Sequence, residues 1–130
     1  MERIFNRGRA TLIAGISLLS VAFASSAQAE TFLAMAEERG CMWCARWNED
    51  VSTEYPKTAE GRAAPLRRFD ISAPPSDIIF NSPVRFTPTF ILVRDGQELS
   101  RLEGYPGEDF FWGLLQRMLT EGDIDFDGTG

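Results

Sequence analysis

The chain has 130 residues, enough for one ordinary domain and too few for two. Acidic residues outnumber basic ones by 19 to 13, which argues against nucleic acid and anionic membranes as partners, because both are bound by basic surfaces. With two cysteines and no histidine, one chain cannot supply the four Cys or His ligands of a closed zinc site, so we expect neither a metal nor another cofactor.

Residues 1–29 are predicted to be a cleaved signal peptide. Arg3, Arg7 and Arg9 form a basic start, an apolar run follows, and Ala27-Gln28-Ala29 fits the A-x-A pattern of a cleavage site. The apolar run is shorter than the roughly 20 residues of a membrane-spanning helix. Cleavage would leave ten basic and eighteen acidic residues, a net charge of −8. We therefore expect a periplasmic protein in a compartment where disulfides persist.

The mature chain begins with a predicted strand followed by a helix. Residues 31–36, "TFLAMA", are apolar enough for a short buried strand. Cys44, Trp47 and Val51 then recur at helical spacing. This helix should end near Pro56, because the residue before a proline resists the helical conformation.

The middle of the chain carries weaker patterns. We expect a surface connection over residues 57–64 and a second strand over 66–71. Three prolines punctuate residues 73–83, which leaves room for at most a short helix at 77–80.

The last third is more regular. Residues 89–93, "TFILV", are typical of a central strand that is buried on both faces. Asp95-Gly96 predicts a hairpin to a strand at 99–103. A broad apolar stripe then predicts a helix over 108–121. The sequence therefore predicts a small α/β domain over residues 30–121, followed by a flexible acidic tail at 122–130.

Cys41 and Cys44 allow three interpretations: a structural disulfide, a metal site or a redox pair. A disulfide between them would close a very small ring and stabilise the fold little, and the ligands for a metal are missing. A CxxC at the first strand-to-helix junction is typical of a redox pair. Cys41 would lie at the start of the helix, where free N–H groups stabilise a thiolate, and Cys44 one turn further in could resolve a mixed disulfide.

A second motif, "RFTPTF" at residues 85–90, lies immediately before the predicted central strand. With the CxxC and the Asp-Gly hairpin it resembles the thioredoxin superfamily over nearly all of residues 31–121. The resemblance implies a thioredoxin-like α/β fold, with a small mixed central sheet of about four strands flanked by helices. It also implies that Pro88 is a cis-proline facing the CxxC, and that the backbone of Thr87 binds the substrate.

The resemblance makes Cys41 and Cys44 the catalytic pair of a thiol–disulfide oxidoreductase. Between them Met42-Trp43 replaces the usual Gly-Pro, and we interpret Trp43 as an aromatic in the motif's turn that serves as a contact surface. The motif has no histidine, unlike strongly oxidising relatives, which favours a reductase over an oxidase.

One departure from the family concerns a buried carboxylate. Many thioredoxins carry one on the first strand, where it accepts the proton of the resolving cysteine. The strand "TFLAMA" has no acid, and Glu37 or Glu38 could replace it only if the fold bends one of them inward. General, promiscuous reductase turnover is therefore open to question.

The Gly-Cys-x-aromatic-Cys motif and the ending "GYPGEDFFWGLL" resemble periplasmic thioredoxin-like proteins of bacterial sulfur-oxidation (Sox) clusters, a SoxS-like group. This resemblance implies a monomeric reductase that keeps the cysteine of a partner protein reduced, such as a sulfur-oxidation carrier protein. A membrane thiol transporter of the DsbD or CcdA type would recharge it. Two alternatives stay open: a dithiol oxidase or isomerase, and a redox-switched binding module without general reductase turnover.

Overall fold

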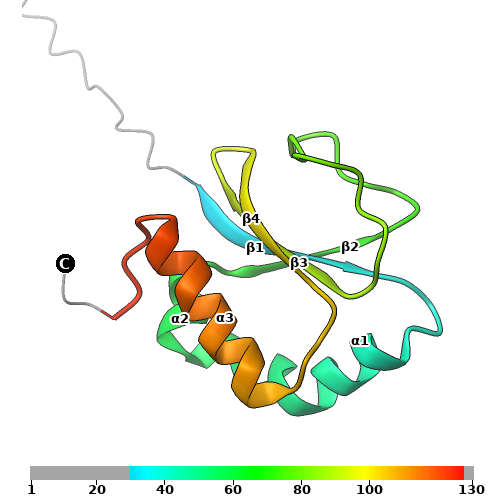
Figure 1. Ribbon diagram of the computed structural model, residues 1–130, viewed down its shortest axis with the longest axis horizontal. Coiled ribbons are helices and arrows are strands. Elements are labelled where there is room, and N and C mark those ends of the chain that lie inside the picture. Colours follow the sequence, from blue (N-terminus) through cyan, green and yellow to red (C-terminus); the bar gives the residue numbers. More distant parts are fainter. Residues whose placement is uncertain (1–29, 128–130) are drawn as a thin grey trace, which may run out of the picture.

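The computed structural model describes residues 30–127, so the predicted signal peptide and residues 128–130 lie outside the described part of the chain. Four strands form one mixed sheet in the order β2-β1-β3-β4 (Figure 1). Strand β1 runs parallel to β2 and antiparallel to β3, and β3 runs antiparallel to β4. The strands are β1 (Thr31–Glu37), β2 (Leu66–Asp70), β3 (Thr89–Arg94) and β4 (Gln97–Glu103). This sheet, flanked by helices, confirms the predicted fold class.

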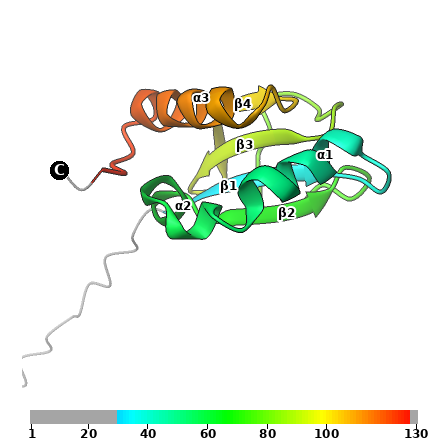
Figure 2. The same cartoon turned by 90° about the horizontal axis from the view of Figure 1, so that it is seen from below.

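The helices lie on one face of this sheet, with α3 beside β4 and the α1 and α2 region beneath β1 and β2 (Figures 1 and 2). The α-helices are α1 (Met42–Trp47), α2 (Ala59–Ala63) and α3 (Glu108–Glu121). The chain leaves α1 through a π-helical turn, η1 (Asn48–Ser52), and a 3₁₀ turn, η2 (Tyr55–Lys57). The first predicted helix therefore exists, but only its first half has α-helical hydrogen bonding.

The strands β1 and β3 supply both faces of the core, because successive residues of a strand point to opposite sides. On the helical face they place four large side chains against the helices, where these pack with the fully buried Trp47 of α1 and Phe111 of α3. On the opposite face the apolar side chains packed against them come from the irregular segment 71–88 and β2. The four residues of the helical face are Leu33, Met35, Phe90 and Leu92.

The predicted hairpin forms at Asp95 and Gly96, which both adopt the left-handed backbone conformation, with φ of 53° and 75°. This is the geometry that favours an Asp-Gly pair in a two-residue turn. Strand β4 begins earlier than predicted, at Gln97, and carries a bulge: Val93 pairs with Glu98 and Leu92 with Ser100. Leu99 is therefore an extra residue, which explains the imperfect alternation of this strand in the sequence.

Residues 57–64 differ from the predicted surface connection, because they contain α2. Thr58 begins this helix: its hydroxyl oxygen accepts a hydrogen bond from the backbone N–H of Gly61 at 3.0 Å. Gly61 lies directly against the backbone carbonyl of Tyr55, where a Cβ atom would collide. The sequence contains two features of this helix, a threonine that caps it and a glycine that allows close packing. The segment is too short, however, to show apolar residues at helical spacing.

Residues 77–80 do not form the short helix that we considered. Instead the segment is hydrogen-bonded to the β3–β4 hairpin: the N–H of Ile79 donates to Gly96 O at 2.7 Å, and the N–H of Glu98 donates to Ile79 O at 3.1 Å. The irregular segment is thus anchored to the edge of the sheet before it reaches Thr87 and Pro88.

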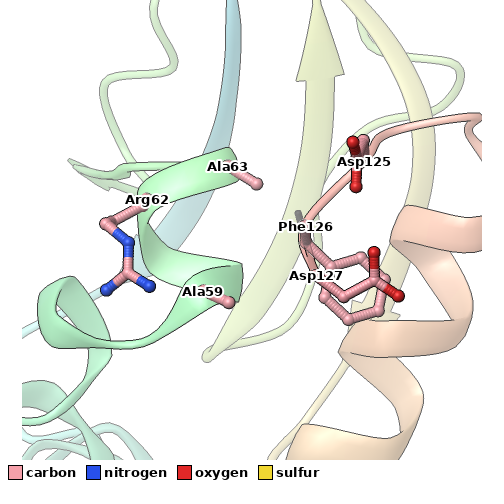
Figure 3. Close-up of a pocket in the computed structure, with 6 residues that line it drawn as sticks. All are labelled: Ala59, Arg62, Ala63, Asp125, Phe126 and Asp127. Atoms are coloured by element: carbon pink, nitrogen blue, oxygen red, sulfur yellow. The ribbon is translucent and has the colours of Figure 1, made fainter. Parts of the chain in front are cut away.

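The segment after α3 also differs from the predicted flexible tail. Ile124 and Phe126 are partly buried against the helical-face core, and aspartates alternate with them. Figure 3 shows Phe126 across a pocket of about 350 Å³ from Ala59 and Ala63 of α2. Residues 122–127 therefore pack on the domain. The alternation allows the apolar side chains to face the core while the acidic ones stay exposed.

Candidate active site

The two cysteines lie where the chain passes from β1 into α1. Gly40, with a φ of 81°, makes the turn, and Cys41 caps the helix. Cys41 and Cys44 form a disulfide with their Cα atoms 5.3 Å apart. The backbone N–H of Cys44 donates to the Cys41 sulfur at 3.1 Å. Cys41 is partly exposed whereas Cys44 is only 4% exposed, so the cysteine with the N–H donor is also the more exposed residue.

Thr87 and Pro88 come immediately before β3 and are linked through Glu38 to the turn that precedes Cys41. The peptide bond between them is cis, as the family resemblance implies, and Pro88 is buried. The hydroxyl of Thr87 donates to the Glu38 carboxylate at 2.7 Å, which joins the two motifs across 49 positions of sequence. Within residues 30–127 the backbone N–H and C=O of Thr87 have no hydrogen-bond partner. Both groups are free to pair with an extended segment of another protein.

Large exposed apolar side chains occur in both motifs. Met42 and Trp43, between the cysteines, are 72% and 55% exposed, and Phe86, just before Thr87, is 58% exposed. Exposed apolar side chains next to a reactive group are typical of an interaction surface. Trp43 also borders a surface cavity of about 660 Å³. The other residues that line it are Arg46, Asp50, Tyr105, Pro106, Gly107 and Glu108.

Tyr105 and Asp50 form the polar wall of that cavity. The Tyr105 hydroxyl donates to Asp50 at 2.8 Å, and Arg46 donates to the same carboxylate oxygen at 3.3 Å. Burial, then the hydrogen bond to Asp50, raises the pKa of Tyr105 above its ordinary value, so this hydroxyl stays a neutral donor. No sequence motif identifies this pair. Tyr105 stood in the conspicuous "GYPG" stretch, but no local pattern connects it to Asp50.

The carboxylate that many thioredoxins bury below the resolving cysteine has no counterpart on β1. Met35 is buried in the core cluster that contains Cys44. Glu37 pairs with Arg68 at 2.7 Å, and Glu38 is exposed and bound to Thr87, so neither bends into the core. Among residues 30–127 the buried carboxylate is Glu98, which lies on β4.

A scan against protein-family models and a search of curated proteins each found no match to the chain. A solved structure does match: the periplasmic thioredoxin SoxS from Paracoccus pantotrophus, in its reduced form. The two sequences are 48% identical, the match covers 72% of this chain and 99% of SoxS, and the TM-score is 0.70. The chain belongs to the SoxS family of thioredoxins. With its CxxC disulfide, this SoxS-family protein is a thiol–disulfide oxidoreductase.

In the part of the chain from residue 30 to residue 127, the longest helix, α3, and the other helices are too short or too polar to cross a membrane.

Proposed function

We propose that this SoxS-family thioredoxin is a periplasmic reductase that keeps the cysteine of a partner protein reduced. In this proposal Cys41 attacks, Cys44 resolves, and Thr87, Pro88 and Trp43 bind the partner. The observation that carries it is the asymmetry of the cysteines: Cys41 is accessible and accepts a hydrogen bond from an N–H group, whereas Cys44 is buried. A thiolate is the attacking species, and such a donor stabilises it.

The reaction starts from the dithiol form. The Cys41 thiolate attacks one sulfur of a partner disulfide, so that the partner's S–S bond breaks and a mixed disulfide forms with Cys41. The departing partner thiolate takes up a proton. Cys44 then loses its proton and attacks the Cys41 sulfur, which releases the second partner thiolate. Two electrons pass to the partner, and the Cys41–Cys44 disulfide described above is the product.

Several features support a protein as the substrate. The free backbone groups of Thr87 suit an extended chain, and the exposed side chains of Met42, Trp43 and Phe86 offer apolar contact. The periplasmic setting is supported by the A-x-A signal pattern and by the periplasmic relative. We propose that a sulfur-oxidation carrier protein is the partner and that a DsbD- or CcdA-type transporter returns the electrons to the monomeric reductase.

The experiment that tests this proposal traps a mixed disulfide between insulin and the protein without its predicted signal peptide. We expect Cys44→Ser to accumulate a mixed disulfide with an insulin chain, because Cys41 attacks and nothing resolves the product. Non-reducing gel electrophoresis and mass spectrometry measure the adduct. Cys41→Ser is the matched control and should trap none. Trapping by Cys41→Ser alone would reverse the two roles, and trapping by neither variant would contradict the proposed reaction.

A second candidate is a redox-switched binding module. It is favoured by Met35, which stands in the core cluster where a proton-accepting carboxylate would assist Cys44. Negligible insulin reduction by the wild type, together with tight binding of one partner in one redox state, would support this alternative. A reduction potential well above that of thioredoxins would instead support the oxidase or isomerase.

A further inference from the structure

We propose that Glu38 is a positioning residue, which holds the partner-binding residue Thr87 in place beside the cysteine pair. This inference rests on the proposed function, because it assumes that Thr87 binds the partner through its backbone. Glu38 follows β1 directly and precedes Cys41 by three residues. Its side chain is exposed, so packing does not explain its orientation.

Glu38 contacts both halves of the site. Its backbone carbonyl accepts from the N–H of Cys41 at 3.3 Å, which closes the turn into the helix. Its carboxylate accepts from the Thr87 hydroxyl at 2.7 Å. A single residue therefore links the backbone that carries the attacking sulfur to the side chain of Thr87. Hydrogen bonds to a charged acceptor are stronger than those between neutral groups.

The hydrogen bond to Glu38 matters because, within residues 30–127, Thr87 makes no other hydrogen bond. The chain is fixed just before it, where the Thr89 hydroxyl donates to Phe86 O at 2.7 Å, and just after it, where the Gly104 N–H donates to Pro88 O at 2.7 Å. Within residues 30–127, the hydrogen bond to Glu38 is the one that Thr87 itself makes. It holds the residue through its side chain and leaves the backbone N–H and C=O for the partner. Small errors in such placement slow reactions that depend on it.

The carboxylate also carries a charge near Cys41, which disfavours the thiolate, and the two effects have to be separated. Glu38→Gln keeps an oxygen that accepts from Thr87 but removes the charge. Glu38→Ala removes both, and Thr87→Val removes the donor and keeps the backbone. Because the side chain is exposed, water and salt screen the charge. Positioning should therefore dominate the kinetics.

The experiment is a double-mutant cycle with two substrates. For insulin, we expect kcat/KM to fall about threefold to tenfold in Glu38→Ala and in Thr87→Val, and the double variant to be no slower than either single one. Glu38→Gln should restore most of the rate. Reaction of the reduced proteins with the small disulfide 5,5′-dithiobis(2-nitrobenzoate), which makes no strand contact, should stay within about twofold of wild type.

Glu49→Ala, which removes an exposed carboxylate just after the CxxC helix, is the matched control and should leave both rates unchanged. Additive losses in the cycle, or equal losses with both substrates, would overturn the positioning role. So would a Glu38→Gln variant as slow as Glu38→Ala, since that result assigns the effect to charge. If the wild type itself fails to reduce insulin, the proposed function fails. If the wild type reduces insulin but the losses in the double-mutant cycle are additive, the positioning role of Glu38 is rejected and the proposed function stands.

Discussion

The two faces of the sheet are held in different ways, and each supplies one half of the proposed active site. On the helical face, Trp47 packs against Phe90 and Phe111 with ring centroids 5.3 and 5.7 Å apart. On the opposite face the irregular segment 71–88 contributes few buried side chains. There Arg101 donates to the carbonyls of Ser82 and Pro83, at 2.7 and 3.3 Å, and pairs with Glu98.

This difference has a functional consequence. The helical face carries the cysteine pair, because Cys44 belongs to the same core cluster as Trp47. The opposite face delivers Thr87 and Pro88, at the end of a segment that polar contacts hold in place. Apolar packing thus fixes the reactive sulfurs, and directional hydrogen bonds fix the residues proposed to bind the partner.

The largest effect should come from the helical face. We expect Phe111→Ala to lower the free energy of unfolding by about 3–5 kcal/mol, because its fully buried ring contacts several aromatic neighbours and would leave a cavity. Urea denaturation followed by fluorescence measures this loss. The neighbouring Phe110 is 70% exposed, and its replacement by alanine should change stability by less than about 0.5 kcal/mol. Equal losses in both variants would mean that the cluster does not hold this face together.

Arg101→Met tests the polar anchor of the other face. The Glu98 and Arg101 side chains are 2% and 13% exposed, and removal of the cation leaves a nearly buried carboxylate without its partner. We expect a loss of about 2–4 kcal/mol, and slower insulin reduction because the segment that leads to Thr87 loses the hydrogen bonds from Arg101 of β4 to Ser82 and Pro83. A variant that loses stability but keeps the wild-type rate would show that the anchor does not control the site.

The same pair adds a dependence on pH. Burial would raise the pKa of Glu98, but hydrogen bonds from Arg101 and from the backbone of Asn81 outweigh it and hold the pKa below its usual range. A carboxyl group whose pKa is lower in the folded than in the unfolded protein stabilises the fold at pH values above its unfolded pKa of about 4.3. This contribution is lost as the pH falls through the pKa that the group has in the folded protein. The gap in stability between wild type and Arg101→Met should therefore narrow below about pH 4.

The same contrast explains which features could be predicted from sequence. Strands β1 and β3, helix α3 and the hairpin follow from local patterns, and the redox pair follows from spacing, so these were predicted. Contacts such as Glu38 with Thr87, or Arg101 with Ser82, join residues that no periodic pattern relates. The packing of Phe126 on the core was missed because its acidic neighbours masked the apolar alternation. Long-range polar contacts therefore need the structure.

The face of the sheet opposite the helices has a second ion pair, between Arg67 and Asp77. We expect its loss to cause the smallest decrease in the free energy of unfolding. The pair makes two hydrogen bonds of 2.8 Å each, but the side chains are 40% and 61% exposed. Water and salt screen such a pair, and the fold loses little when it is broken. Arg67→Met is matched to Arg101→Met and keeps the apolar stem of Arg67, whose guanidinium lies over the Phe32 ring.

We expect Arg67→Met to shift the urea midpoint less than Arg101→Met does, and the shift to shrink further in salt. Insulin reduction should be unchanged, because Arg67 anchors the segment far before Thr87 in sequence. A loss as large as that of Arg101→Met would mean that the number of hydrogen bonds sets the strength of this face. The smaller loss would show instead that burial of the charged groups decides which contacts hold the segment that leads to the proposed partner-binding residues in place.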